Sequence, residues 1–165
     1  MDTGSLARLT LAPASGAVTH EVLTDRGMEF PRIDDRFTGT KNRYGWGLEM
    51  DMRRPNELKG GSAGGFLMNC LFLKDLESGA EQHWWCGPVS SLQEPCFVPR
   101  SKDAPEGDGW IVMVCNRLED HRSDLLIFDA LDIEKGPVAT VQVPIRLRFG
   151  LHGNFVRAED IGLAA

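Results

Sequence analysis

The stretch Ala139-Thr-Val-Gln-Val-Pro-Ile-Arg-Leu-Arg-Phe149, continued by Gly150-Leu-His152-Gly-Asn-Phe155, carries the pattern on which the rest of the chain is built. Apolar side chains take every second position from 139 to 149, and polar residues or proline lie between them. This alternation predicts a half-buried β-strand over 139–149. Gly150 then leaves the backbone free to turn, so that the chain presents one imidazole, that of His152, between two glycines.

The β pattern extends over most of the chain, whereas helical periodicity is almost absent. Candidate helices are confined to 55–59 and the last residues. Apolar or alternating runs bounded by Pro, Gly and Ser predict further strands at 6–11, 17–23, 44–48, 66–73, 80–85, 110–115 and 125–128. The predicted fold class is therefore all-β.

Two features narrow the architecture. The runs 66–73, 110–115 and 125–128 are apolar on both faces, which predicts sheets stacked face to face, as in a sandwich or a propeller. In addition, Glu94-Pro-Cys-Phe-Val-Pro-Arg100 aligns with His152-Gly-Asn-Phe-Val-Arg157, and Glu29-Phe-Pro-Arg32 is a shorter copy.

The first residues of these copies, Glu29, Glu94 and His152, are 65 and 58 residues apart. Propeller blades recur at roughly 40–50 residues before loop insertions. Because equivalent positions on successive blades face one central axis, we expect the two carboxylates and the imidazole to converge there.

Composition limits the class of protein. The chain has 165 residues, 42% hydrophobic and 25% charged, which is typical of one globular domain. A net charge of −6 argues against a nucleic-acid surface. We see no transmembrane segment and no signal peptide, and therefore expect a cytoplasmic protein. The four cysteines lack zinc-site spacing, and Cys70 and Cys115 are expected to be small core residues.

His152 is the candidate metal ligand, with Glu29 and Glu94 as the acids that orient it. A ligating histidine normally donates a hydrogen bond from its second ring N–H to a carboxylate or carbonyl. The alternative is a turn histidine that is hydrogen-bonded to backbone. The remaining histidines have neighbours that indicate structural roles; these are His20, His83 and His121. His152 alone would not suffice, because one imidazole does not hold a catalytic metal.

Several stretches resemble, in the same order, the carotenoid cleavage oxygenases, a family that includes bacterial stilbene-cleaving dioxygenases. They are Glu29-Phe-Pro-Arg-Ile-Asp-Asp-Arg-Phe37, Arg43-Tyr-Gly-Trp46, Glu94-Pro-Cys-Phe-Val-Pro-Arg100, Asp108-Gly-Trp110, Leu126-Ile-Phe-Asp-Ala130, Gly136-Pro-Val-Ala139 and Phe149-Gly-Leu-His-Gly-Asn-Phe155.

The resemblance implies blades from the C-terminal part of a seven-bladed β-propeller, with residues 1–165 forming one partial propeller domain. It implies non-haem ferrous iron, Fe(2+), held by four histidines and braced by three glutamates. His152 matches the last ligand, and Glu29 and Glu94 match two of the glutamates. Arg148 and Leu151 stand where relatives more often have proline and phenylalanine.

The implied reaction is cleavage by O2 of a conjugated C=C bond to give two carbonyl products. The substrate would be an apolar stilbene-type phenolic or an apocarotenoid, with Phe30, Trp46 and Phe155 as candidate tunnel residues. The other ligands of the family lie in earlier blades, so this chain is expected to be catalytically incomplete without them.

Two other interpretations stay open. The first is a non-catalytic β-propeller fragment that acts as a binding or interaction module. The second is a single-domain β-barrel or sandwich with a transition metal at its mouth.

Overall fold

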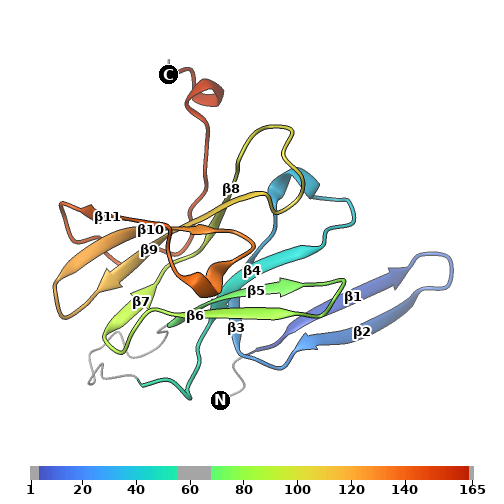
Figure 1. Cartoon of the computed structure of the whole chain (residues 1–165). Helices are drawn as coiled ribbons and strands as arrows, with labels where there is room; N and C mark the ends of the chain where they lie inside the picture. Colours follow the sequence, from blue (N-terminus) through green and yellow to red (C-terminus); the bar gives the residue numbers. More distant parts are fainter. Residues whose placement is uncertain (1–3, 56–67, 164–165) are drawn as a thin grey trace.

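The computed structural model describes residues 4–55 and 68–163. This part of the chain contains eleven β-strands, three 3-10 helices and no α-helix, which confirms the all-β prediction (Figure 1). The candidate helix at 55–59 lies almost wholly outside the described residues. Near the C-terminus the chain forms only the short 3-10 helix η3 (Ala158–Ile161).

None of the helices in the described ranges has the length and apolarity that a membrane span requires.

Two antiparallel sheets form the body of the molecule. The first sheet runs in chain order through β3 (Met28–Arg32), β4 (Tyr44–Glu49), β5 (Cys70–Asp75) and β6 (Glu81–Trp85). The second has the order β11-β10-β9, and two short strands, β7 and β8, pair with successive halves of β9. Its strands are β7 (Ser90–Leu92), β8 (Cys96–Pro99), β9 (Gly109–Arg117), β10 (Arg122–Asp129) and β11 (Ala139–Val143). Two further 3-10 helices, η1 (Asp35–Phe37) and η2 (Ile133–Lys135), lie in the connections.

The core fills the space between these two sheets. Trp46 of β4 stacks on Phe97 of β8 with ring centroids 5.0 Å apart, and its indole N–H donates to the Ala130 carbonyl at 2.8 Å. The other buried apolar side chains come from both sheets and include Leu48, Leu71, Leu73, Ile111, Met113, Cys115, Leu126 and Phe128. Each buried side chain of this size contributes about 1.5–3 kcal/mol of transfer free energy, so this shared core holds the two sheets together.

Strand β5 is buried on both faces, as predicted for the described part of 66–73. For 110–115 and 125–128 the same expectation holds in part. Along β9 and β10 buried residues alternate with half-buried ones, so one face of this sheet is buried and the other is covered in part.

The predicted strand over 139–149 ends early. Strand β11 stops at Val143, which pairs with Ser123 near the start of β10. Beyond this point β10 offers almost no further ladder partner, and Pro144 has no N–H to donate. The chain therefore continues from 144 to 157 without regular structure.

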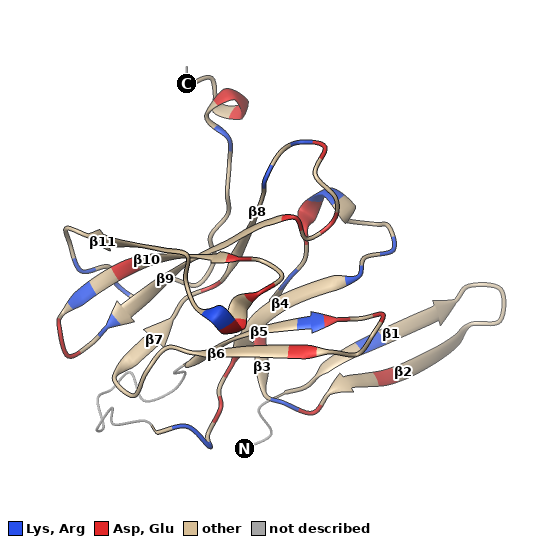
Figure 2. Cartoon of the chain, viewed as in Figure 1, with Lys and Arg blue, Asp and Glu red and all other residues tan. Residues whose placement is uncertain are grey.

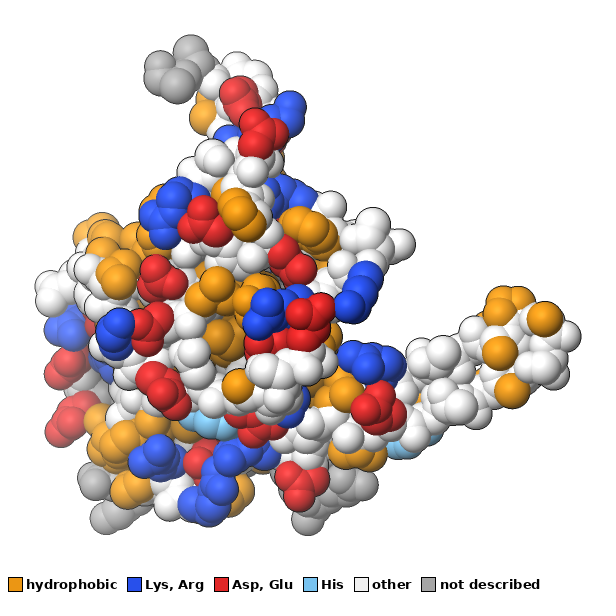
Figure 3. Space-filling model, turned by 45° about the vertical axis from the view of Figure 1, so that its right-hand side comes forward, with side chains coloured by type: hydrophobic (Ala, Val, Ile, Leu, Met, Phe, Trp, Pro, Cys, Tyr) orange, Lys and Arg blue, Asp and Glu red, His pale blue; other side chains and the backbone are white. Residues whose placement is uncertain are grey.

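The strands predicted at 6–11 and 17–23 are confirmed as β1 (Leu6–Ala12) and β2 (Ala17–Thr24), which pair as a hairpin. It stands clear of the body as an arm (Figure 3). Cross-strand pairing places Leu9, Leu11, Val18 and Val22 on one face, and these side chains are more than half exposed. Arg8 pairs with Glu21 on the other face.

Charged residues lie mostly at strand ends and in loops (Figure 2). Asp124 is an exception, because it is buried in β10 and accepts hydrogen bonds from Arg117 and Arg122, each through Nε at 2.9 Å. Burial alone would raise the pKa of Asp124, but the bonds from the two guanidinium groups hold that pKa below its ordinary value.

Gly109 opens β9 at a point where the neighbouring strand comes very close. A Cβ at this position would collide with the carbonyl oxygen of Val98 and lie 2.9 Å from the Phe97 ring. Glycine is therefore required here by close packing of backbone against backbone.

Candidate functional site

A cleft of about 650 Å³ brings together the residues that the internal repeat aligns. It lies where β3, the end of the β7–β8 connection and the 144–157 segment meet. Its lining residues are Glu29, Phe30, Pro31, Arg32, Met68, Glu94, Phe149, Leu151 and His152. The two predicted carboxylates and the predicted imidazole thus share one cavity.

The ring of His152 is fixed at one nitrogen. Its Nδ1 lies 3.4 Å from both carboxylate oxygens of Glu94, and the backbone N–H of Gly153 donates to the same carboxylate at 2.8 Å. The Glu94 side chain is 7% exposed whereas that of His152 is 79% exposed. No described residue hydrogen-bonds Nε2. An ionised Glu94 favours the tautomer with the proton on Nδ1, which leaves the Nε2 lone pair free for a ligand bond.

Phe30 packs beside this imidazole, with ring centroids 5.8 Å apart in an edge-on arrangement. Its backbone has φ +52°, which is unusual for a residue other than glycine. The pairing of β3 with β4 is irregular between Glu29 and Arg32, so the strand bulges at Phe30. Both residues of the bulge, Phe30 and Pro31, line the cleft.

Arg32 supplies positive charge to the site. Its guanidinium lies 3.5 Å from Glu94 and donates to Asn154 Oδ1 at 3.3 Å. It also lies 3.6 Å from Asp35. The same carboxylate therefore faces a cation on one side and His152 Nδ1 on the other.

Glu29 contributes a free carboxylate. It is exposed within the cleft, and none of the described residues forms a hydrogen bond or ion pair with its side chain. It is therefore available to a group that approaches from outside the described part of the chain.

The three aromatic residues predicted to line a tunnel lie in three different places in the structure. Phe30 lines the cleft beside His152. Trp46 does not, because it is 1% exposed and belongs to the core between the sheets. Phe155 lines a second, more polar cavity together with Asp34 and Arg36.

Sequence reasoning missed five residues of the cleft, namely Pro31, Arg32, Met68, Phe149 and Leu151. Arg32, Phe149 and Leu151 lie within three residues of a predicted site residue, so proximity in sequence was the available signal. Met68 precedes β5 and carries no such signal.

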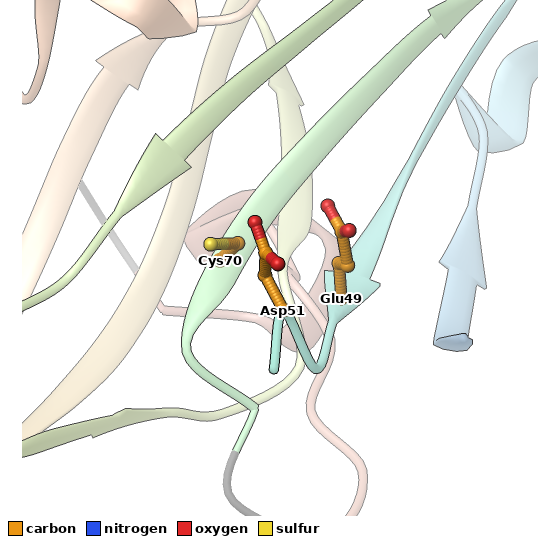
Figure 4. Close-up of side chains that lie close together, drawn as sticks. All are labelled: Glu49, Asp51 and Cys70. Carbon is orange, nitrogen blue, oxygen red and sulfur yellow. The ribbon is translucent and has the colours of Figure 1, made fainter. Parts of the chain in front are cut away.

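A second group of possible metal ligands, Glu49, Asp51 and Cys70, lies within one buried patch (Figure 4). Its carboxylates are already engaged: Arg26 and His83 bond Glu49 at 2.7 and 2.8 Å, and Arg53 bonds Asp51 at 2.6 Å. Burial raises the pKa of the Cys70 thiol to about 12, so the thiol stays protonated. This arrangement is an ion-paired network that does not suit a metal.

The donors of the cleft, by contrast, fit one corner of an iron site. Imidazole nitrogen is a suitable ligand for ferrous iron, and a buried carboxylate on the opposite nitrogen is the usual support. His152 and Glu94 show this pairing. Within the described part of the chain, His152 is the single imidazole that lines the cleft.

The sequence profile of the family described as retinal pigment epithelial membrane protein matches residues 1–157. The chain belongs to this family, which contains the carotenoid cleavage oxygenases. Lignostilbene-alpha,beta-dioxygenase isozyme III of Sphingomonas paucimobilis is 48% identical over 137 residues, which are 83% of this chain and 28% of that protein. Isoeugenol monooxygenase of Pseudomonas nitroreducens is 41% identical, over 90% of this chain and 31% of that protein.

Solved structures of the family share the fold. The lignostilbene dioxygenase of Pseudomonas brassicacearum superposes with a TM-score of 0.86 at 37% identity, over 92% of this chain and 32% of that one. A cobalt-substituted Synechocystis oxygenase gives 0.79 at 30% identity, over 90% and 29% of the two chains. The chain thus spans about a third or less of the length of these carotenoid cleavage oxygenase relatives.

Proposed function

We propose that this chain is part of a non-haem Fe(II) dioxygenase that cleaves a conjugated C=C bond with O2 to give two carbonyl products. The observation that carries the proposal is the ring of His152, which lines the cleft, is held at Nδ1 by a buried Glu94 and has no described hydrogen-bond partner at Nε2. Bound ferrous iron would supply the oxygen chemistry that breaks the alkene.

Different residues of the chain would bind the metal and orient its ligands. His152 would bind the metal through Nε2, and Glu94 would hold the ring in place by accepting a hydrogen bond from the Nδ1–H. Glu29, which has no described partner, would do the same for an imidazole from elsewhere in the protein. The remaining ligands would therefore come from outside the described residues, and residues 1–165 would form part of one seven-bladed propeller domain.

The apolar lining would bind the substrate and exclude water. Phe30, Phe149, Leu151 and Met68 offer a surface for a flat conjugated molecule. We propose a stilbene-type or phenylpropanoid phenolic over an apocarotenoid. The relatives named for lignostilbene and isoeugenol are 48% and 41% identical to this chain, whereas an apocarotenoid-15,15'-oxygenase of Synechocystis is 31% identical.

The test is cleavage of a hydroxystilbene by the complete Fe(II)-loaded polypeptide, followed as formation of the two aldehydes. His152→Ala should abolish cleavage, because it removes a metal ligand. His20→Ala is the matched control, since His20 is exposed on the β1–β2 arm, and it should leave the rate unchanged. Full activity of His152→Ala would overturn the site assignment. A wild-type protein that neither binds iron nor cleaves the alkene would favour the interaction-module interpretation.

A further inference from the structure

The segment that carries His152 is held in place by side chains. From 144 to 156 the described residues show no backbone-to-backbone hydrogen bond. Instead, Ser123 Oγ accepts from the Leu147 N–H at 2.9 Å, and Glu94 accepts from Gly153 as described above. Between these two points the segment depends on one further side chain, that of Gln93.

Gln93 makes a double contact with the backbone of the segment. Its Oε1 accepts from the Gly150 N–H at 3.2 Å, and its Nε2 donates to the Arg148 carbonyl at 3.2 Å. Its own backbone N–H donates to the Val114 carbonyl on β9 at 2.9 Å. The side-chain amide therefore takes the place of a neighbouring strand and connects the segment to the sheet.

Gly150 is adapted to this contact. A Cβ at position 150 would lie 2.8 Å from Gln93 Oε1, so a larger residue would push the amide away. The close approach of these two groups fixes the backbone two residues before His152.

We propose that Gln93 is a positioning residue for His152, and this inference rests on the proposed function of the cleft. Gln93 fixes the segment on one side of the imidazole, while the adjacent Glu94 fixes the ring and the Gly153 N–H on the other. Together they hold the ring where a metal in the cleft can use Nε2.

The chain contains a matched control for this proposal. Gln82 on β6 makes the same double contact with another loop: Nε2 donates to the Leu131 carbonyl and Oε1 accepts from the Ile133 N–H, both at 2.9 Å. Both glutamines are half-buried, and Gln82 does not line the cleft. Loss of either amide should therefore affect stability alike, but only loss of Gln93 should affect the metal.

The experiment compares Gln93→Met and Gln82→Met in the complete polypeptide, since methionine keeps the side-chain length and removes both hydrogen bonds. Three quantities are measured: the melting temperature, hydrogen exchange of peptides that cover 146–156 without metal, and the rate at which Fe(II) is lost to a chelator. We expect similar small falls in melting temperature. We expect faster exchange of 146–156 and about tenfold faster iron loss in Gln93→Met alone.

Unchanged exchange of 146–156 in Gln93→Met would overturn the proposal. So would faster exchange with unchanged iron loss, or equal iron loss in the two variants. A wild-type protein that takes up no iron would contradict the proposed function instead, and the exchange measurement would still decide whether Gln93 holds the segment.

Discussion

Glu94 acts on two neighbouring groups at once, because one oxygen accepts from the Gly153 N–H while the carboxylate also faces His152 Nδ1. Neither contact depends on the size of the side chain. Together the two contacts require a group with two acceptor oxygens. The residue-scale consequence is that removal of the charge alone should disturb the ring, even though the side chain keeps its shape.

Glu94→Gln should therefore weaken metal retention in the complete protein. An amide presents one oxygen and one NH2, so either the Gly153 N–H or the imidazole N–H loses its acceptor. We expect iron loss to a chelator at least about tenfold faster than in wild type. Glu21→Gln, an exposed change on the β1–β2 arm, is the control and should retain iron normally; equal behaviour of the two variants would refute the role of Glu94.

The sequence located four residues of the cleft, Glu29, Phe30, Glu94 and His152, because the repeat registers equivalent positions. It misplaced Trp46, whose indole finds its acceptor, the Ala130 carbonyl, 84 residues away. Such a partner leaves no local signal. Gln93 was overlooked for the same reason, since its contacts lie 55 and 57 residues further along the chain.

At the scale of elements, the available pairing partners determine where a strand ends, which the residue pattern alone does not. The alternation over 139–149 continues past Val143, but β10 has almost no residue left to pair with it. Local turn chemistry, by contrast, bounds the predicted strands at 6–11, 17–23 and 80–85 correctly, and these strands lie in the hairpins β1–β2 and β5–β6.

Strands β9 and β10 are also joined by charge. Asp124 has a pKa below its ordinary value, so its ionisation stabilises the fold above the ordinary aspartate range and this contribution is lost as pH falls through the folded-state pKa. We expect Asp124→Asn to lower the free energy of unfolding at pH 7 by about 2 kcal/mol. We also expect a shallower loss of stability below about pH 4. Urea denaturation at pH 7 and below about pH 4 measures both effects. The prediction would be contradicted if the stability of the variant fell with pH as steeply as that of the wild type.

At the scale of the whole molecule, the family and the all-β class were predictable because motifs in fixed order cover most of the chain. The count of seven blades stays a prediction, because the described residues contain only two body sheets and an arm. The chain also leaves large apolar side chains exposed on β11 and the segment after it, including Val141, Ile145 and Leu151.

The whole-molecule prediction concerns the metal. Since one described imidazole lines the cleft, we expect the 165-residue chain, purified alone, to retain no stoichiometric iron after passage over a chelating resin. Elemental analysis of the purified protein measures this. One tightly bound iron per chain would show that His152 and the carboxylates suffice.

Gly109 has a consequence for how this sequence can change over time. Every other amino acid brings a Cβ, and that atom meets the Val98 carbonyl whichever side chain follows it. In a library randomised at this codon and selected only for soluble protein, glycine alone should survive. The neighbouring Asp108 and Trp110, which are half-buried, should accept substitutions. Neutral substitutions can accumulate along much of β9, but its first residue, Gly109, must remain glycine.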